Sequence, residues 1–220
     1  MRTLLLPGTL CDAALWAGVT LPPGAHAAPA LRGRTLAEAA AACAAACSGP
    51  LHVVGFSLGA IVAFELLRRW PARVQRLTLI SANPLAPTGA QLAAWAAQEA
   101  AVHARPDGFD SVARQLAAAA GPHAAAAVLD MARRVGPAAF LEQLALLRAR
   151  PDSRPALQAF TGPLTLLVGG ADPITPPDLS HAAAACAPHA AVTVVPGAGH
   201  YLPLDAPGAV TAHLRAWTYA

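Results

Sequence analysis

The sequence predicts an α/β fold, with a mainly parallel sheet of about six strands flanked by helices and covered at one edge by a helical cap. Short apolar runs alternate with longer Ala- and Leu-rich helical runs, a pattern typical of a parallel sheet covered on both faces. One stretch, from about residue 85 to 155, is Ala-rich and has no strand signal. We therefore expect an α/β core formed by residues 1–84 and 156–220, and a helical cap formed by residues 85–155.

Each element of the core follows from a local pattern. Strands are predicted where apolar or β-branched runs end at Gly, Pro or Ser: 3–6, a weaker candidate at 26–31, 51–55, 74–80, 164–168 and 191–195. Helices are predicted over 39–47, 60–70, 177–187 and 207–217. The first of these follows Thr35-Leu36-Ala37-Glu38, which matches a capping box. The cap is expected to break at 105–108, 121–122, 136–137 and 151, where Gly or Pro interrupts the pattern.

Composition narrows the class of protein. The chain has 220 residues, enough for one domain with a real core, and only 12% of them are charged. No strongly apolar run approaches the ~20 residues that a membrane span needs. The apolar run at the N-terminus is too short for a signal peptide. We expect a cytoplasmic protein that does not bind membranes.

The basic residues and the cysteines exclude several chemistries. All fifteen basic residues are Arg, so Schiff-base chemistry, pyridoxal phosphate attachment and a Walker P-loop are excluded. Aromatic residues are few and the Arg residues form no stripe, which argues against nucleic-acid binding. The four cysteines form no CxxC pair and no His lies at ligand spacing, so no metal site is expected. The chemistry should need no cofactor.

The most informative stretch is 51–60. A buried-strand pattern leads into Gly55-Phe56-Ser57-Leu58-Gly59, which fits G-x-S-x-G, and a helical pattern follows. Strand, tight turn and helix are the context in which Ser57 would be presented as a nucleophile. The alternative is an ordinary strand-to-helix turn in which Ser57 caps the helix.

A serine nucleophile needs a base and an acid that orients the base. His200 follows a strand in Gly197-Ala198-Gly199-His200, whereas His52 lies inside the elbow strand and is expected to be structural. For the acid, Asp172 directly follows a strand. Asp178 and Asp205 remain as competitors, with Asp178 expected to cap a helix.

Two backbone N–H groups would hold the oxyanion of a tetrahedral intermediate. One should belong to Leu58, which follows the nucleophile at the start of a helix. The other should come from the loop after the first strand, with Thr9 as the first candidate and Leu10 as the second. The alternative for Pro7-Gly8 is a simple turn.

Taken together, the motifs resemble those of the α/β-hydrolase superfamily, and the order Ser57, Asp172, His200 is the one that this family uses. The resemblance covers nearly the whole chain and rests on five correctly ordered motifs: 7–16, 28–33, 55–59, 169–176 and 197–207. Within the family, the sequence resembles small esterases, thioesterases and C–C hydrolases such as pimeloyl-carrier-protein methyl esterases and menaquinone-pathway hydrolases. Pro7 replaces the family's His, Ala30 replaces an Asp, and Asp205 stands where Glu is common. Because the first strand pattern begins at residue 3, we expect the sheet to lack the first two family strands.

The resemblance implies hydrolysis of a carboxylic ester or thioester with a small-to-medium apolar acyl group. C–C bond hydrolysis, lactone opening and perhydrolysis would use the same residues, and a non-catalytic binding module is a less favoured alternative. Residues expected near the substrate are Leu10, Trp95, Phe109, Met131, Phe140 and Tyr201. The charges of the cap nearly balance, which allows an acyl carrier protein as partner without indicating one, and nothing in the sequence gives the oligomeric state.

Overall fold

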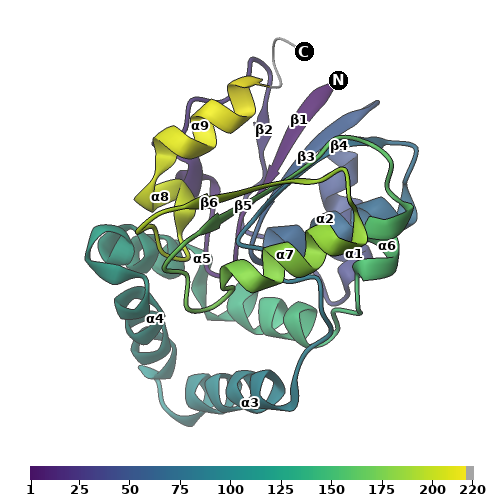
Figure 1. The fold of residues 1–220 in the computed structure, drawn as a ribbon. Coiled ribbons are helices and arrows are strands. Elements are labelled where there is room, and N and C mark those ends of the chain that lie inside the picture. Colours follow the sequence, from purple (N-terminus) through teal and green to yellow (C-terminus); the bar gives the residue numbers. More distant parts are fainter. Residues whose placement is uncertain (217–220) are drawn as a thin grey trace.

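A computed structural model describes residues 1–216 of the chain. Within them, six strands form one sheet in the order β2-β1-β3-β4-β5-β6, and every neighbouring pair is parallel (Figure 1). The strands are β1 (Arg2–Leu6), β2 (His26–Ala27), β3 (Leu51–Phe56), β4 (Val74–Ile80), β5 (Leu164–Gly169) and β6 (Ala191–Val195). The predicted α/β fold with a six-stranded, mainly parallel sheet is confirmed.

Helices cover both faces of the sheet. One face carries α1 (Leu36–Ala45), α2 (Leu58–Arg69), α6 (Arg154–Ala159) and α7 (Pro177–Cys186). The other face carries a short 3₁₀ helix, η1 (Ala13–Trp16), with α8 (Leu202–Asp205) and α9 (Pro207–Ala216). The last helix is predicted to reach Trp217, which lies outside the described residues.

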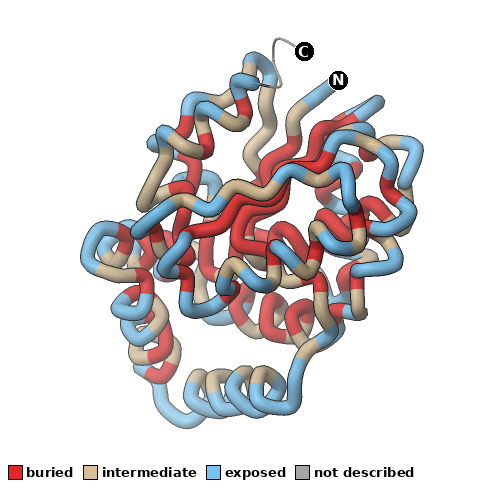
Figure 2. The backbone as a smooth tube through the Cα atoms, viewed as in Figure 1, coloured by how far each residue is buried: buried red, intermediate tan, exposed pale blue. Residues whose placement is uncertain are grey.

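The two faces of the sheet explain why the core has two parts. Successive strand residues point to opposite faces, so Leu4 and Leu6 join one apolar cluster while Leu5 joins the other. All three side chains are fully buried. Figure 2 shows this buried band running through the strands and α2.

The residues between β4 and α6, called the insertion here, are helical and lie beyond one edge of the sheet. They form α3 (Gly89–Ala104), α4 (Gly108–Ala119) and α5 (Gly121–Arg148). The chain bends sharply inside α5, where Gly136 has φ 77° and precedes Pro137, at one of the predicted breaks. No residue of α3 is buried, and Figure 2 shows its exposed turns. The division into core and cap remains a prediction.

One predicted strand is shorter in the structure. The pattern at 26–31 predicts a full strand, whereas β2 spans only His26–Ala27. Pro29 has no N–H for the ladder, and after the Ala28 N–H donates to the Leu5 carbonyl the chain leaves the sheet.

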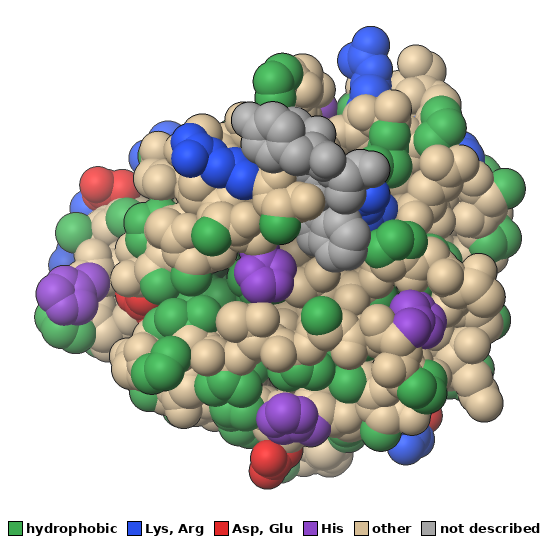
Figure 3. Space-filling model, turned by 45° about the horizontal axis from the view of Figure 1, so that its top comes forward, with side chains coloured by type: hydrophobic (Ala, Val, Ile, Leu, Met, Phe, Trp, Pro, Cys, Tyr) green, Lys and Arg blue, Asp and Glu red, His purple; other side chains and the backbone are tan. Residues whose placement is uncertain are grey.

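The surface is mixed in character. Figure 3 shows the face near both termini, on which Arg and His side chains are scattered singly among apolar ones. Among the described helices, none has both the length and the apolar character needed to cross a membrane.

Candidate active site

Four loops with chemically distinctive residues meet at one edge of the sheet. The register pairs Leu6 with Gly55, Phe56 with Ile80, Ile80 with Leu167, and Gly169 with Val195. The strands therefore end level with one another, and their carboxyl ends share one edge. The loops after β1, β3, β5 and β6 carry Thr9, Ser57, Asp172 and His200.

Ser57 sits in a tight turn that the neighbouring glycines permit. Its backbone has φ 52°, a left-handed conformation that is costly for a residue with a Cβ. A Cβ on Gly55 would lie 2.6 Å from the Gly59 carbonyl oxygen, and a Cβ on Gly59 would overlap the Leu6 carbonyl. The helix α2 can therefore start directly against the strands, with Ser57 at the point where strand becomes helix.

His200 connects the other two predicted groups. Its Nε2 lies 3.1 Å from the Ser57 hydroxyl oxygen, and its Nδ1 lies 2.9 Å from Asp172 Oδ2. Both His200 and Asp172 are buried. A carboxylate can only accept, so Nδ1 donates to Asp172 and Nε2 is left to accept the Ser57 proton. The structure thus brings the three side chains into one hydrogen-bonded chain, and their catalytic roles remain predictions.

The Asp172 carboxylate is well supplied with donors. Oδ1 accepts from the N–H groups of Ile174 and Thr175, each at 2.8 Å, and Oδ2 accepts from the Thr175 hydroxyl at 2.7 Å. Burial alone would raise the pKa of Asp172, but the His200 hydrogen bond and charge, followed by the Thr175 donors, lower it below its ordinary value. The group is therefore held as the anion that an imidazolium needs beside it.

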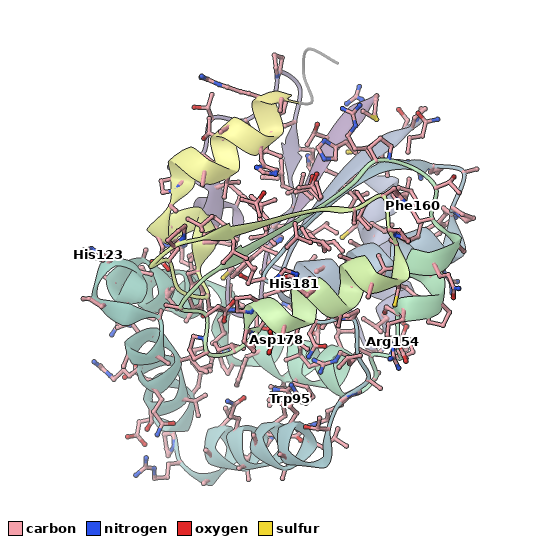
Figure 4. The ribbon with its side chains drawn as sticks, in the orientation of Figure 1. Trp95, His123, Arg154, Phe160, Asp178 and His181 are labelled. Atoms are coloured by element: carbon pink, nitrogen blue, oxygen red, sulfur yellow. The ribbon has the colours of Figure 1, made fainter. Side chains whose placement is uncertain are left out.

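The competing candidates lie elsewhere. Asp178 is exposed in the first turn of α7 (Figure 4). Asp205 accepts from the Gly199 N–H at 3.1 Å, and burial raises its pKa. His52 is buried in β3 with its Nε2 2.9 Å from the Thr78 hydroxyl, and burial, with the nearby Arg76 charge, lowers its pKa to about 4. Of the acids considered, Asp172 is the one in contact with His200.

Of the two candidate N–H groups in the loop after β1, only one is free to bind the oxyanion of an intermediate. The Leu10 N–H donates to the side-chain oxygen of Gln143 on α5 at 2.9 Å, so it is already committed. The Thr9 N–H has no acceptor among the described residues, and Thr9 lines the cavity beside Ser57. Leu58 is the first residue of α2, and its N–H precedes the first bond within the helix. This geometry favours Thr9 over Leu10 as the second donor.

A cavity of about 140 Å³ opens beside Ser57 and His200. Three of the residues predicted near the substrate line it: Trp95, Phe140 and Tyr201. Trp95 projects from α3 toward α5 (Figure 4). The rest of the apolar wall of the cavity includes Ile61, Leu116, Leu144 and Leu147. The cavity is thus enclosed jointly by the sheet edge and the insertion.

The other three residues predicted near the substrate are not among those that line the cavity. The Leu10 side chain is buried in the core, and Met131 is buried in the cluster on the opposite face of the sheet. Phe109 packs against Phe140, with 6.0 Å between ring centroids. Apolar character alone does not separate residues that face a cavity from residues that support its wall.

Sequence reasoning missed several polar residues around the site. Ser81 is buried and donates its hydroxyl to the His200 carbonyl at 3.0 Å. Thr175 donates to Asp172, Arg150 lines the cavity, and Gln143 binds the Leu10 N–H. Thr175 carries a detectable signal, because it follows an Asp in a Pro-containing loop where Asx turns are common. The other three lie in no motif, and only the tertiary structure shows their contacts.

Comparisons with known proteins agree with this architecture. The sequence profile of the alpha/beta hydrolase fold family matches residues 35–207, whereas a search of curated proteins finds no significant match. Similar solved structures include an esterase from Thermogutta terrifontis with malate bound, at a TM-score of 0.85 and 22% identity, covering 100% of this chain and 89% of that chain.

Two further structures extend the comparison. A hydrolase from Pseudomonas aeruginosa PA01 has a TM-score of 0.83 and 20% identity, covering 100% of this chain and 90% of that chain. The enol-lactonase from Burkholderia xenovorans LB400 has a TM-score of 0.78 and 16% identity, covering 100% and 91%. At these identities the likeness concerns the fold. With the profile match over most of its length, the chain belongs to the α/β-hydrolase family.

Proposed function

We propose that the protein is a serine hydrolase that cleaves a carboxylic ester or thioester with a small apolar acyl group through an acyl-enzyme. The observation that carries this proposal is the hydrogen-bonded chain from the Ser57 hydroxyl through His200 to Asp172, with distances of 3.1 and 2.9 Å. It lies beside a cavity with apolar walls. A buried, oriented imidazole next to a serine hydroxyl is the arrangement that activates an otherwise weak nucleophile.

The first half of the reaction forms the acyl-enzyme. Ser57 Oγ attacks the carbonyl carbon while its proton passes to His200 Nε2, and the carbonyl π electrons move onto the oxygen. The resulting imidazolium is stabilised by the anionic Asp172 beside Nδ1. His200 then gives the proton to the departing alcohol or thiol as the tetrahedral intermediate collapses.

The negative oxygen of the intermediate would be held by two N–H groups. Leu58 supplies one from the start of α2, where the helix dipole also favours negative charge. Thr9 supplies the other, since its N–H is uncommitted and it lies beside Ser57 in the cavity wall. Water attacks the ester in the second half, with His200 taking the water proton and returning it to Ser57 as the acid leaves.

The cavity suggests the size of the acyl group. Its volume of about 140 Å³ is close to that of a cavity known to hold one benzene molecule, about 150 Å³. Acetyl to butyryl groups would fit against Phe140, Leu144 and Leu147, and longer chains would have to displace part of the insertion. Lactone opening is a second candidate, because the enclosed volume also fits a small ring and attack on a lactone uses the same groups.

The proposal is tested by comparing hydrolysis of p-nitrophenyl acetate, butyrate and octanoate, the matching methyl esters and thioesters, and γ-butyrolactone. We expect the acetyl and butyryl substrates to be preferred. Ser57→Ala should lower kcat by about 10⁴-fold or more, and Asp172→Asn by about 10³- to 10⁴-fold. Asp178→Asn is the matched control and should retain wild-type activity. Equal turnover by wild type and Ser57→Ala would overturn the proposal.

A further inference from the structure

The loop after β1 adopts a conformation that its residues do not favour. The Cys11 N–H donates to the Gly8 carbonyl at 3.2 Å, which closes a four-residue turn around Thr9 and Leu10. Leu10 occupies the third position of this turn with φ 56°. That position and sign of φ favour glycine, and a leucine there is strained. Some other contact must therefore hold the turn in place.

Gln143 supplies that contact from the insertion. Its side chain is completely buried where α5 passes over the loop. Its Oε1 accepts from the Leu10 N–H at 2.9 Å, and its Nε2 donates to the Leu31 carbonyl at 3.0 Å. Only the oxygen can accept from an N–H and only the nitrogen can donate to a carbonyl, so the two partners also determine the orientation of the amide.

The neighbouring residue on α5 makes a separate connection. Glu142 accepts from Arg32 at 2.8 and 2.5 Å and from the Gly33 N–H at 2.9 Å. Glu142 thus joins α5 to the loop after β2 without touching the turn. Gln143 reaches further inward, and one amide links the insertion, the loop after β2 and the loop beside Ser57.

We propose that Gln143 is a positioning residue that holds the Thr9 N–H in place to stabilise the oxyanion. This inference rests on the proposed serine-hydrolase function. Gln143 is not among the residues that line the cavity beside Ser57; it acts by binding the Leu10 N–H, which belongs to the peptide group directly after Thr9.

Removing the amide should release the turn. The buried Leu10 N–H would lose its acceptor, which is unfavourable for a buried donor. A turn with negative φ at Leu10 would then become the better alternative. Such a change rotates the peptide group between Thr9 and Leu10. The Thr9 N–H belongs to the preceding peptide group, between Gly8 and Thr9, and it shifts when the turn closed by the Cys11-to-Gly8 hydrogen bond changes shape. The substrate pocket itself is lined by other side chains, so ground-state binding should change little.

The test uses Gln143→Met, which keeps a chain of similar length without the two hydrogen bonds. We expect kcat for p-nitrophenyl butyrate to fall about 10- to 100-fold while KM stays within about twofold. The inhibition constant of butylboronic acid, which forms a tetrahedral adduct on serine, should rise by the same factor as kcat/KM falls. Gln143→Glu should recover most of the loss, because Glu keeps an acceptor for the Leu10 N–H whether or not it is ionised.

Glu142→Ala is the matched control, and it should show near-wild-type kcat and boronate affinity. An unchanged kcat in Gln143→Met would overturn the inference, as would equal losses of kcat in Gln143→Met and Glu142→Ala. If Gln143→Met does not fold, Gln143→Glu decides alone: a kcat and boronate affinity both within about threefold of wild type support the inference, and a larger loss overturns it. Failure of the underlying function would look different, because activity would then persist in Ser57→Ala with Gln143 intact.

Discussion

The sheet edge and the outermost helix of the insertion are built in different ways. Every residue of β3 is buried, and so are nine residues of α2, so the turn carrying Ser57 is packed from both sides. Helix α3 also contributes to the cavity, through Trp95, yet none of its residues is buried. The wall of the site formed by the sheet edge is part of the protein core, whereas the wall formed by α3 lies at the protein surface.

Two Arg side chains, one at the end of α5 and one two residues beyond it, hold α3 instead. Arg148 donates to the Trp95 carbonyl at 2.9 Å and pairs with Glu99 at 2.6 Å. Arg150 donates to the Gln91 side chain at 2.7 Å and lies 5.3 Å from the centre of the Trp95 ring. The Arg148–Glu99 ion pair is partly exposed, and such pairs contribute about 1 kcal/mol or less.

The difference indicates that bond cleavage and acyl-group selection depend on separate parts of the molecule. Groups proposed to act in bond cleavage are held by backbone geometry and by the apolar core, where small changes are costly. A wall proposed to contact the acyl group is held by a few polar side-chain contacts, and none of the residues of α3 is buried, so changes there are tolerated. Substitutions at the sheet edge should therefore affect folding and catalysis, and substitutions at the α3 anchors should affect the choice of substrate.

The largest effect is expected for Gly59→Ala. The added Cβ would overlap the backbone carbonyl of Leu6, which cannot move without shifting β1. We expect the free energy of unfolding to fall by about 3 kcal/mol, measured by urea denaturation, with loss of esterase activity. Gly208→Ala is the control, since a Cβ there meets no atom within 4 Å and Ala favours the helix. Equal stability of the two variants would contradict the close packing described for the elbow.

His52, on the same strand as the elbow, should make the stability of the protein depend on pH. Its pKa is about 4 in the folded protein because of burial and then the Arg76 charge, against 6.5 as the ordinary value. Between these values the unfolded chain binds more protons, so stability is full above pH 6.5 and falls as pH drops toward 4. The loss should reach about 2–3 kcal/mol.

Two variants test whether His52 causes this pH dependence of the unfolding free energy. His52→Gln should flatten the dependence of unfolding free energy on pH between 6.5 and 4.5. Thr78→Val removes the hydroxyl partner but leaves His52 buried, so the window should persist in that variant. A wild-type slope in His52→Gln would show that another group produces the pH dependence.

A smaller effect is expected at the α3 anchors. Arg150→Met removes the bonds to the Gln91 side chain and the Leu85 carbonyl, so α3 should move more easily away from the cavity. We expect the ratio of kcat/KM for p-nitrophenyl octanoate to that for butyrate to rise about 3- to 10-fold. Arg154→Met is the control, because Arg154 is exposed on α6 and pairs with Asp152 two residues away (Figure 4). Equal ratios in both variants would mean that α3 does not limit the acyl group.

The same division explains what could be predicted from the sequence. The turn around Ser57 is visible because strand, G-x-S-x-G and helix follow one another directly in the chain, although Gly59 is required by a contact with the distant Leu6. Asp172 and His200 follow strands, and the level ends of a parallel sheet bring such residues to one edge. These positions follow from local sequence patterns and from the order of strands and helices along the chain, and both can be predicted from the sequence.

The missed features depend on distant contacts. Gln143 reaches Leu10 across 133 residues of sequence, and nothing near it distinguishes it from a surface glutamine. Only part of the cavity wall could be predicted, because Phe109, Met131 and Phe140 are all apolar and the helical pattern does not distinguish them. Which of them faces the cavity follows from the bend at Gly136 and the packing of α4 on α5.

The most direct test of the account is covalent labelling with a fluorophosphonate, followed by peptide mapping and an esterase assay on the same sample. One equivalent of phosphonate should attach to Ser57, and esterase activity should disappear in proportion to labelling. Ser57→Ala should take up no label while retaining a native melting transition. Labelling at another residue, or full activity after Ser57 is completely modified, would contradict the account.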